Sequence, residues 1–89
     1  MISRRVTIIN KLGLHARAAS KLVSCASAFA SEVWLRRSGR EINGKSIMGV
    51  LTLAAGEGTE LEVRVDGPDE GVAMATLEQL IESRFGEEQ

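Results

Sequence analysis

The sequence predicts an α+β fold, an open-faced β-sandwich in which helices cover one face of a sheet and solvent covers the other. Short segments alternate between apolar and polar residues, which is typical of strands with one buried and one exposed face. Other segments repeat apolar residues at the helical period. These segments follow one another in the order β-α-β-β-α-β-α, and strands with one polar face leave that face uncovered.

Length and composition narrow the class of protein. A chain of 89 residues predicts one domain, residues 1–89, with a single modest core. The net charge of −1 and the scarcity of aromatic residues indicate that nucleic acid is not a partner. The lone cysteine, Cys25, cannot form an internal disulfide, which fits a reducing compartment. No apolar run approaches ~18 residues and no signal-peptide pattern opens the chain, so we expect a cytoplasmic protein without membrane insertion.

The first strand and the first helix are predicted from two different periods. Arg5–Asn10 alternates as a strand, and Gly13 lies in a short loop where it permits unusual backbone angles. A helical stripe of apolar residues then follows, at Ala16, Ala19, Leu22, Val23, Ala26, Phe29 and Ala30. The opposite face of this helix carries Arg17, Ser20, Lys21, Ser24 and Ser27.

The middle of the chain predicts a hairpin and a short helix. Glu32–Arg37 alternates as a strand, Ser38-Gly39 is a turn signal, and Arg40–Ile42 is a short returning strand. Ser46 is a suitable N-cap for a brief helix that runs through Leu53.

The last third predicts one strand and one helix. Leu61, Val63 and Val65 alternate with charged residues and form the clearest strand of the chain. Gly67–Glu70 opens the final helix, with proline near its first position and acidic residues in its first turn. The buried side of that helix is predicted to contain Ala73, Leu77, Leu80, Ile81 and Phe85. Gly86 ends the helix, and residues 87–89 are predicted to be a frayed tail.

His15 is the only histidine, and it lies where the loop meets the first helix. A neutral imidazole is a nucleophile near neutral pH, and a helix N-terminus offers unpaired N–H groups to an anion. Arg17 adds a full positive charge two residues later. The combination suits a histidine that accepts a phosphoryl group. A metal site needs further ligands close by, and the chain has no second histidine, so we expect no metal.

Gly13–Arg17, together with its surroundings, resembles the phosphohistidine loop of the HPr family, the phosphocarriers of the bacterial phosphoenolpyruvate-dependent phosphotransferase system. The resemblance extends over nearly the whole chain and includes Thr7–Lys11, Gly44–Leu51 and the helix after Gly67-Pro68. It implies four antiparallel strands covered on one face by three helices. Ala18 stands where many sugar-branch members carry proline, which leaves the sugar branch and the nitrogen-related branch both open.

The resemblance implies a covalent relay with no bound cofactor, rather than an enzyme with its own turnover. His15 would take a phosphoryl group from phospho-enzyme I as a pros-phosphohistidine and pass it to an enzyme IIA-type domain. Arg17 and the backbone N–H groups beside it would hold the phosphoryl oxygens. We expect a monomer.

Ser46 has two compatible interpretations. It is a helix N-cap, and in many HPr proteins the serine at this motif position is phosphorylated by a dedicated HPr kinase/phosphorylase. A regulatory protein of the same family, in which Ser46 matters more than His15, is therefore a further hypothesis. The partner-docking surface implied by the family comprises Ala16, Ser20, Lys21, Ile47, Met48 and Leu51.

Gly39–Ser46 also matches the phosphate-loop pattern GxxxxGK[ST] in full, so the alternative function is a small nucleotide-binding module. A genuine phosphate loop follows a buried parallel strand and opens a sturdy helix. Here Ser38-Gly39 is better explained as a hairpin turn, and Gly49 weakens the helix that follows. We interpret the match as accidental.

Overall fold

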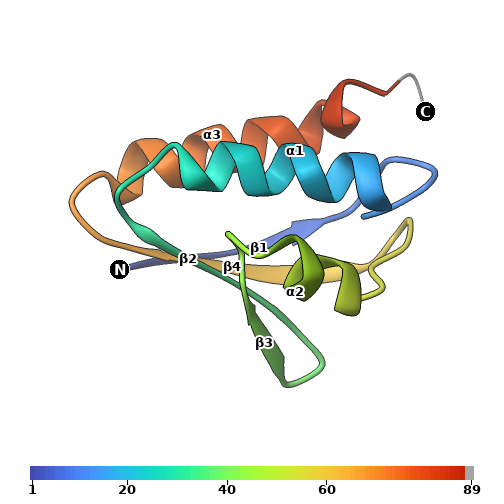
Figure 1. Cartoon of the computed structure of the whole chain (residues 1–89), viewed down its shortest axis with the longest axis horizontal. Helices are drawn as coiled ribbons and strands as arrows, with labels where there is room; N and C mark the ends of the chain where they lie inside the picture. The colour runs from blue at the N-terminus through green and yellow to red at the C-terminus, as the bar shows by residue number, and fades with distance from the viewer. Residues whose placement is uncertain (88–89) are drawn as a thin grey trace.

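The computed structural model describes residues 1–87 (Figure 1). Its strands are β1 (Ile2–Thr7), β2 (Glu32–Arg37), β3 (Arg40–Asn43) and β4 (Glu60–Asp66). Its helices are α1 (Ala16–Ser27), α2 (Ile47–Thr52) and α3 (Glu70–Glu82), and α3 is followed by a single turn at Arg84–Gly86. We refer to Arg84–Gly86 as the C-terminal turn. The order of the elements confirms the predicted β-α-β-β-α-β-α.

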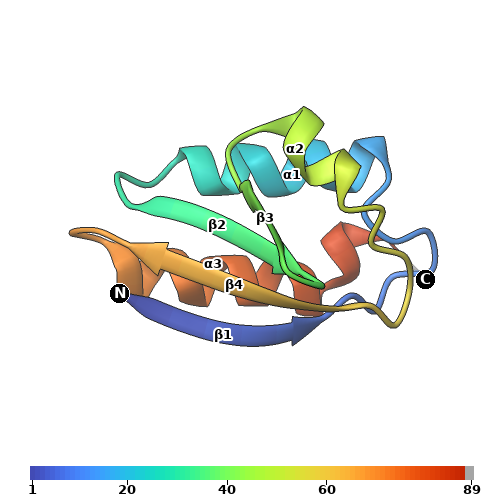
Figure 2. The ribbon, with the colours of Figure 1, turned by 90° about the horizontal axis from the view of Figure 1, so that it is seen from below.

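The four strands form one antiparallel sheet in the order β1-β4-β2-β3 (Figure 2). β4 lies between β1 and β2, where Val63 pairs with Arg4 on one side and with Leu35 on the other. The inward residues of β4 are buried, and the residues between them reach the uncovered face, where Arg64 donates to Glu41 at 3.2 Å. The alternation that predicted this strand therefore reflects two different environments.

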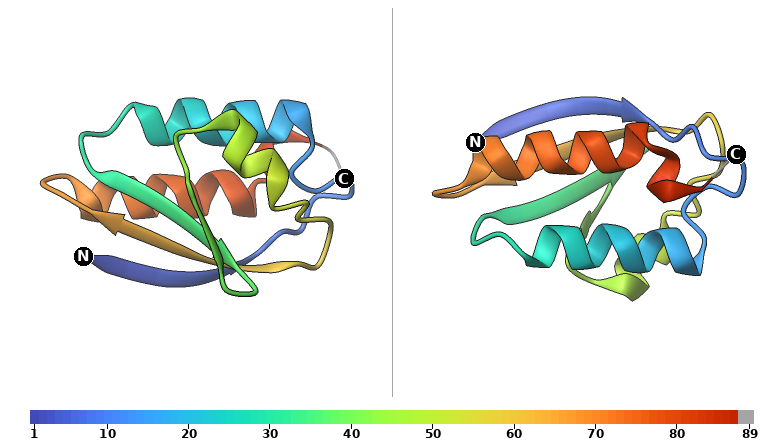
Figure 3. Two further views of the ribbon diagram at one scale, coloured as in Figure 1. Left: turned by 60° about the horizontal axis from the view of Figure 1, so that its bottom comes forward. Right: turned by 90° about the horizontal axis from the view of Figure 1, so that it is seen from above.

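The helices cover the other face of the sheet (Figure 3). α1 and α3 lie side by side across it, and α2 packs beside α1 near β3. Leu22 of α1 and Leu77 of α3 are fully buried between the helices and the sheet. The fold class is the predicted open-faced sandwich. Within residues 1–87, no helix has the length and apolarity needed to cross a membrane.

Two predicted boundaries and one predicted face are wrong in detail. β1 runs from Ile2 to Thr7 rather than from Arg5 to Asn10. Beyond Thr7 the backbone is irregular, and the Ile8 carbonyl accepts a hydrogen bond from Gly58 N–H at 2.7 Å. α1 ends at Ser27, and Ala16 and Ala30 of the predicted stripe are exposed. The buried face contains Ala18, Ala19, Leu22 and Ala26, because the side of α1 that meets the core is rotated toward Ala18 and away from Ala16.

The largest difference from prediction is at the end of the chain. α3 stops at Glu82, and Arg84, Phe85 and Gly86 have positive φ values of 58°, 56° and 77°. This left-handed turn costs on the order of 1 kcal/mol for each non-glycine residue, but it reverses the chain and buries Phe85 to 1% exposure. Phe85 is thus a core residue, although it does not belong to α3. Of the predicted tail, residues 88–89 lie outside the described residues.

Candidate functional site

His15 is the N-cap of α1. Its backbone is extended (φ −74°, ψ 177°), and its carbonyl accepts the first helical hydrogen bond, from Ala19 N–H at 2.8 Å. Its side chain makes no capping hydrogen bond and is 28% exposed. The first N–H groups of α1 are therefore not satisfied by the imidazole, and the ring is partly open to solvent.

The loop before His15 is held against the loop after α2. Leu14 N–H donates to the Ala55 carbonyl at 2.8 Å, and Gly13 has a φ of +66°. A Cβ atom at Gly13 would lie 2.5 Å from the Ala55 oxygen, so only glycine fits this approach. The loop–helix junction predicted from the sequence is thus held in place by the contacts of Gly13 and Leu14 with Ala55.

Glu87 contacts His15 from the far end of the chain. One carboxylate oxygen, Oε2, meets His15 Nε2, and the other, Oε1, accepts from Asn10 Nδ2 at 2.9 Å. The hydrogen bond from Asn10 and, second, the contact with His15 lower the pKa of the Glu87 carboxyl. The prediction that Glu87 belongs to a frayed tail is therefore wrong, because its side chain is tied to the candidate site.

The C-terminal turn brings Glu87 to that position. Phe85 anchors the turn in the core, and Lys21 Nζ donates to the Phe85 carbonyl at 2.6 Å. Figure 1 shows the C-terminal turn at the same end of the molecule as the beginning of α1. Sequence reasoning missed this contact, which spans 72 residues; a buried aromatic followed by glycine and an acid after α3 was the available signal.

The other predicted site residues lie on α1 and α2. Ala16, Arg17 and Ser20 are exposed on the outer face of α1. On α2, which packs beside α1, Ile47 and Met48 are 44% and 72% exposed. Ala16, Ile47 and Met48 are thus exposed apolar residues on two helices that pack against each other.

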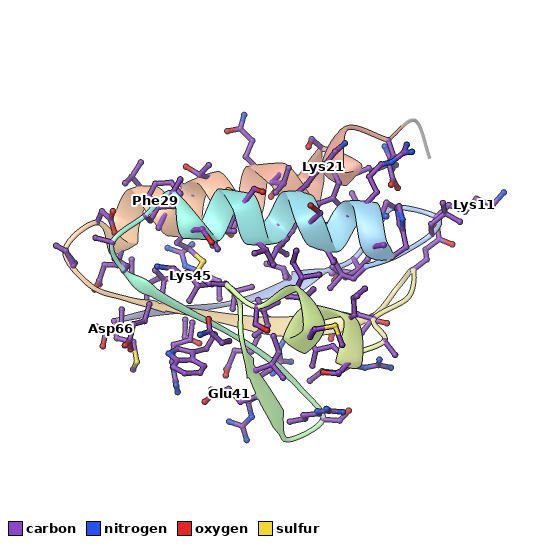
Figure 4. All side chains as sticks on the ribbon, viewed as in Figure 1. Lys11, Lys21, Phe29, Glu41, Lys45 and Asp66 are labelled. Atoms are coloured by element: carbon purple, nitrogen blue, oxygen red, sulfur yellow. The ribbon has the colours of Figure 1, made fainter. Side chains whose placement is uncertain are left out.

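Three of the predicted residues have additional structural roles. Ser46 caps α2, since its Oγ accepts from Gly49 N–H at 3.1 Å. Leu51 is half-buried and packs against the core. Lys21 points toward the C-terminal turn (Figure 4), where its ammonium group donates a hydrogen bond to the Phe85 carbonyl.

Gly39–Ser46 does not have the geometry of a phosphate loop. Four of its residues form β3, an edge strand that pairs antiparallel with β2. Gly44 packs so closely on Val33 that a Cβ would lie 2.6 Å from its side chain. Lys45 Nζ donates to the Phe29 carbonyl at 2.9 Å, and both residues are labelled in Figure 4. The nucleotide-binding alternative therefore has no structural support.

Comparison with known proteins defines the family. A family model described as "PTS HPr component phosphorylation site" matches residues 2–83. A phosphocarrier protein HPr from Cupriavidus necator is 55% identical over 87 residues, 98% of each chain. The crystal structure of HPr-C-His from Thermoanaerobacter tengcongensis is 42% identical, covers all of both chains and superposes with a TM-score of 0.97. An HPr dimer from the same organism gives 0.79 at 41% identity, covering 98% of this chain and all of the other.

These matches, with the open-faced sandwich and the histidine at the start of α1, define the class of protein. The chain belongs to the HPr family of the phosphotransferase system, whose curated members are phosphocarrier proteins.

Proposed function

We propose that this protein carries a phosphoryl group on His15, which it receives from phospho-enzyme I and delivers to an enzyme IIA-type domain. The observation that carries the proposal is the partly exposed imidazole at the uncapped N-terminus of α1. A nucleophile there can be reached by a partner protein, and unpaired N–H groups lie beside it. The protein has no turnover of its own in this scheme and works in the cytoplasm.

The backbone of α1 supports the chemistry. When a phosphoryl group is bound to the ring, its oxygens are anions at the positive end of a twelve-residue helix. The N–H groups of Ala16 and Arg17 and the exposed Arg17 guanidinium are the donors we assign to those oxygens. A phosphohistidine held mainly at the surface stays available for the next transfer.

Arg17→Ala is expected to leave His15 modifiable but to slow transfer in at least one direction. Loss of one charged donor to a developing phosphoryl charge costs about 10²-fold in rate. Rapid-quench measurements of transfer from phospho-enzyme I and to the IIA-type acceptor test this. Arg36→Ala, on the uncovered face of the sheet, is the matched control. Wild-type rates in both directions for Arg17→Ala would exclude the role.

Partner proteins would dock on the surface formed by Ala16 and Ser20 of α1 with Ile47 and Met48 of α2. Met48 is the most exposed of these, and methionine adapts its shape to different partners. Arg17 supplies positive charge at the border of this surface. Acidic groups on the partners would complement that charge and speed association.

Ser46 is the regulatory residue in this proposal, and an HPr kinase/phosphorylase is its modifying enzyme. A phosphate adds a charge of about −1.5 to −2 at the N-cap of α2, next to exposed Ile47 and Met48. The charge agrees with the helix dipole, so the fold keeps its stability. The same charge adds a desolvation cost to docking and repels acidic groups of enzyme I.

Ser46→Asp is therefore expected to raise the KM of enzyme I for the carrier while thermal stability stays at or slightly above wild type. The KM increase should be larger at low ionic strength because the repulsion is screened by salt. Steady-state kinetics at two salt concentrations measure it. Ser3→Asp, which adds the same charge on the uncovered face of the sheet, is the control. An unchanged KM at both salt concentrations would leave Ser46 as a helix cap only.

A further inference from the structure

Glu87 contacts Nε2 of the His15 ring, which is not the nitrogen proposed to accept the phosphoryl group. We propose that Glu87 is a positioning residue, whose carboxylate fixes the His15 tautomer and balances the ring charge that arises on phosphorylation. This inference rests on the proposed function, in which the pros nitrogen, Nδ1, accepts the phosphoryl group. Glu87 itself touches Nε2 and not the reacting atom.

The carboxylate is held at both oxygens. Asn10 is completely buried, and its Nδ2 donates to the Gly13 carbonyl at 2.8 Å as well as to Glu87 Oε1 at 2.9 Å. Both acceptors lie on one side of the amide, so that side must be the NH₂ group, which has two hydrogens to give. Asn10 can therefore only donate to Glu87.

The backbone that carries Glu87 is also held. Arg84 and Phe85, two consecutive non-glycine residues in the left-handed region, are strained, and such strain persists where surrounding contacts enforce it. Here the contacts are the buried Phe85 ring and the hydrogen bond from Lys21 to the Phe85 carbonyl. Without this turn, the chain after α3 would not return to α1.

The contact decides which ring nitrogen has the free lone pair. An ionised carboxylate only accepts hydrogen bonds, so the His15 nitrogen that faces it, Nε2, must carry the hydrogen. The second nitrogen of a neutral imidazole then has no hydrogen. Nδ1 is therefore the nucleophile, in agreement with a pros-phosphohistidine.

The same contact balances charge during transfer. The Nδ1 lone pair forms the new N–P bond while the N–P bond of the donor phosphohistidine breaks and its electron pair returns to the donor nitrogen. The His15 ring then bears a positive charge with its hydrogen on Nε2, directly against the Glu87 carboxylate. The arrangement is equivalent to the carboxylate that orients and stabilises the histidine of a serine-protease triad.

The isosteric variant Glu87→Gln gives the sharpest test. Because Asn10 can only donate, the single side-chain oxygen of the introduced glutamine must face Asn10, and its NH₂ group must face His15. That NH₂ donates to Nε2 and drives the ring hydrogen to Nδ1, which removes the nucleophilic lone pair. In the serine-protease triad, the corresponding acid-to-amide change costs about 10⁴ in rate through the wrong tautomer.

We therefore expect Glu87→Gln to be more damaging than Glu87→Ala. Phosphorylation by enzyme I and phosphoenolpyruvate should slow roughly tenfold in Glu87→Ala, which loses one charge-assisted hydrogen bond, and about 10²-fold or more in Glu87→Gln. Glu82→Gln, which removes the same charge from an exposed site on α3, should behave as wild type. Circular dichroism and thermal melting verify that each variant is folded.

The tautomer is read independently from ¹⁵N chemical shifts of the neutral His15 ring. Wild type should show Nε2–H, and Glu87→Gln should show Nδ1–H. A purely structural role predicts the opposite ranking, with glutamine closer to wild type than alanine, and that result would overturn the inference. A wild-type protein that enzyme I does not phosphorylate would contradict the proposed function instead, while the ¹⁵N spectra would still test Glu87.

Discussion

His15→Ala is expected to abolish phosphoryl acceptance while the domain stays folded. The chain has no second histidine, so no other imidazole can replace the nucleophile. The imidazole makes no capping hydrogen bond in α1 and lies at the border of the core, so its removal costs little folding free energy. Incubation with enzyme I and radiolabelled phosphoenolpyruvate measures acceptance, and thermal melting measures stability.

The label itself identifies the kind of bond. Wild type should acquire a phosphoryl label that is labile in acid and stable in base, as expected of a phosphohistidine. Arg17→Ala should acquire the same label, but more slowly. Labelling of His15→Ala at the wild-type level would refute the central proposal. Saturable binding of ATP to the wild-type protein would instead revive the nucleotide-binding alternative at Gly39–Ser46.

Phe85→Ala is expected to cause the largest loss of stability among these variants. The ring is 1% exposed, and truncation of a buried phenylalanine typically costs about 3 kcal/mol or more of unfolding free energy. The two non-glycine residues of the C-terminal turn also keep their left-handed strain without the packing that offsets it. Urea denaturation gives the free energy difference.

The same variant should lower phosphoryl acceptance, because the C-terminal turn positions Glu87. Phe29→Ala is the matched control, since Phe29 is only half-buried and lies beyond the end of α1, away from His15. It should lose less stability and keep its acceptance rate. If Phe85→Ala were as stable as wild type, the turn would not be anchored as described. If Phe85→Ala were destabilised but accepted the phosphoryl group at the wild-type rate, the C-terminal turn would have no role in phosphoryl acceptance.

Local patterns determined the fold class and the position of His15. The alternation along Leu61–Asp66 matches β4 because neighbouring residues of a strand meet opposite environments. The range Glu32–Arg37 is β2 without correction, and Ser46 caps α2 as predicted. In each case the signal lies within about ten residues of chain, so sequence order alone reveals it.

The chain ends and the beginning of α1 were less predictable, because burial there depends on what lies opposite. Ala16 fits the apolar stripe of α1 but is exposed, and Phe85 fits the stripe of α3 although α3 has already ended. Helical periodicity describes a face of a helix and carries no information on where the neighbouring core stops. A left-handed turn at Arg84–Gly86 is also invisible to residue preference, since only one of its members is glycine.

The sequence by itself determined an open-faced sandwich with one histidine at a helix start, since strand alternation, helix periodicity and capping are local. Only the tertiary structure decided how that histidine is held. It brings the Asn10 amide and the Glu87 carboxylate together around the beginning of α1, and it closes the loop at Gly13 against Ala55. Those contacts join residues up to 77 positions apart. They form because burial of Phe85 and pairing of the strands bring distant segments to one end of the sheet.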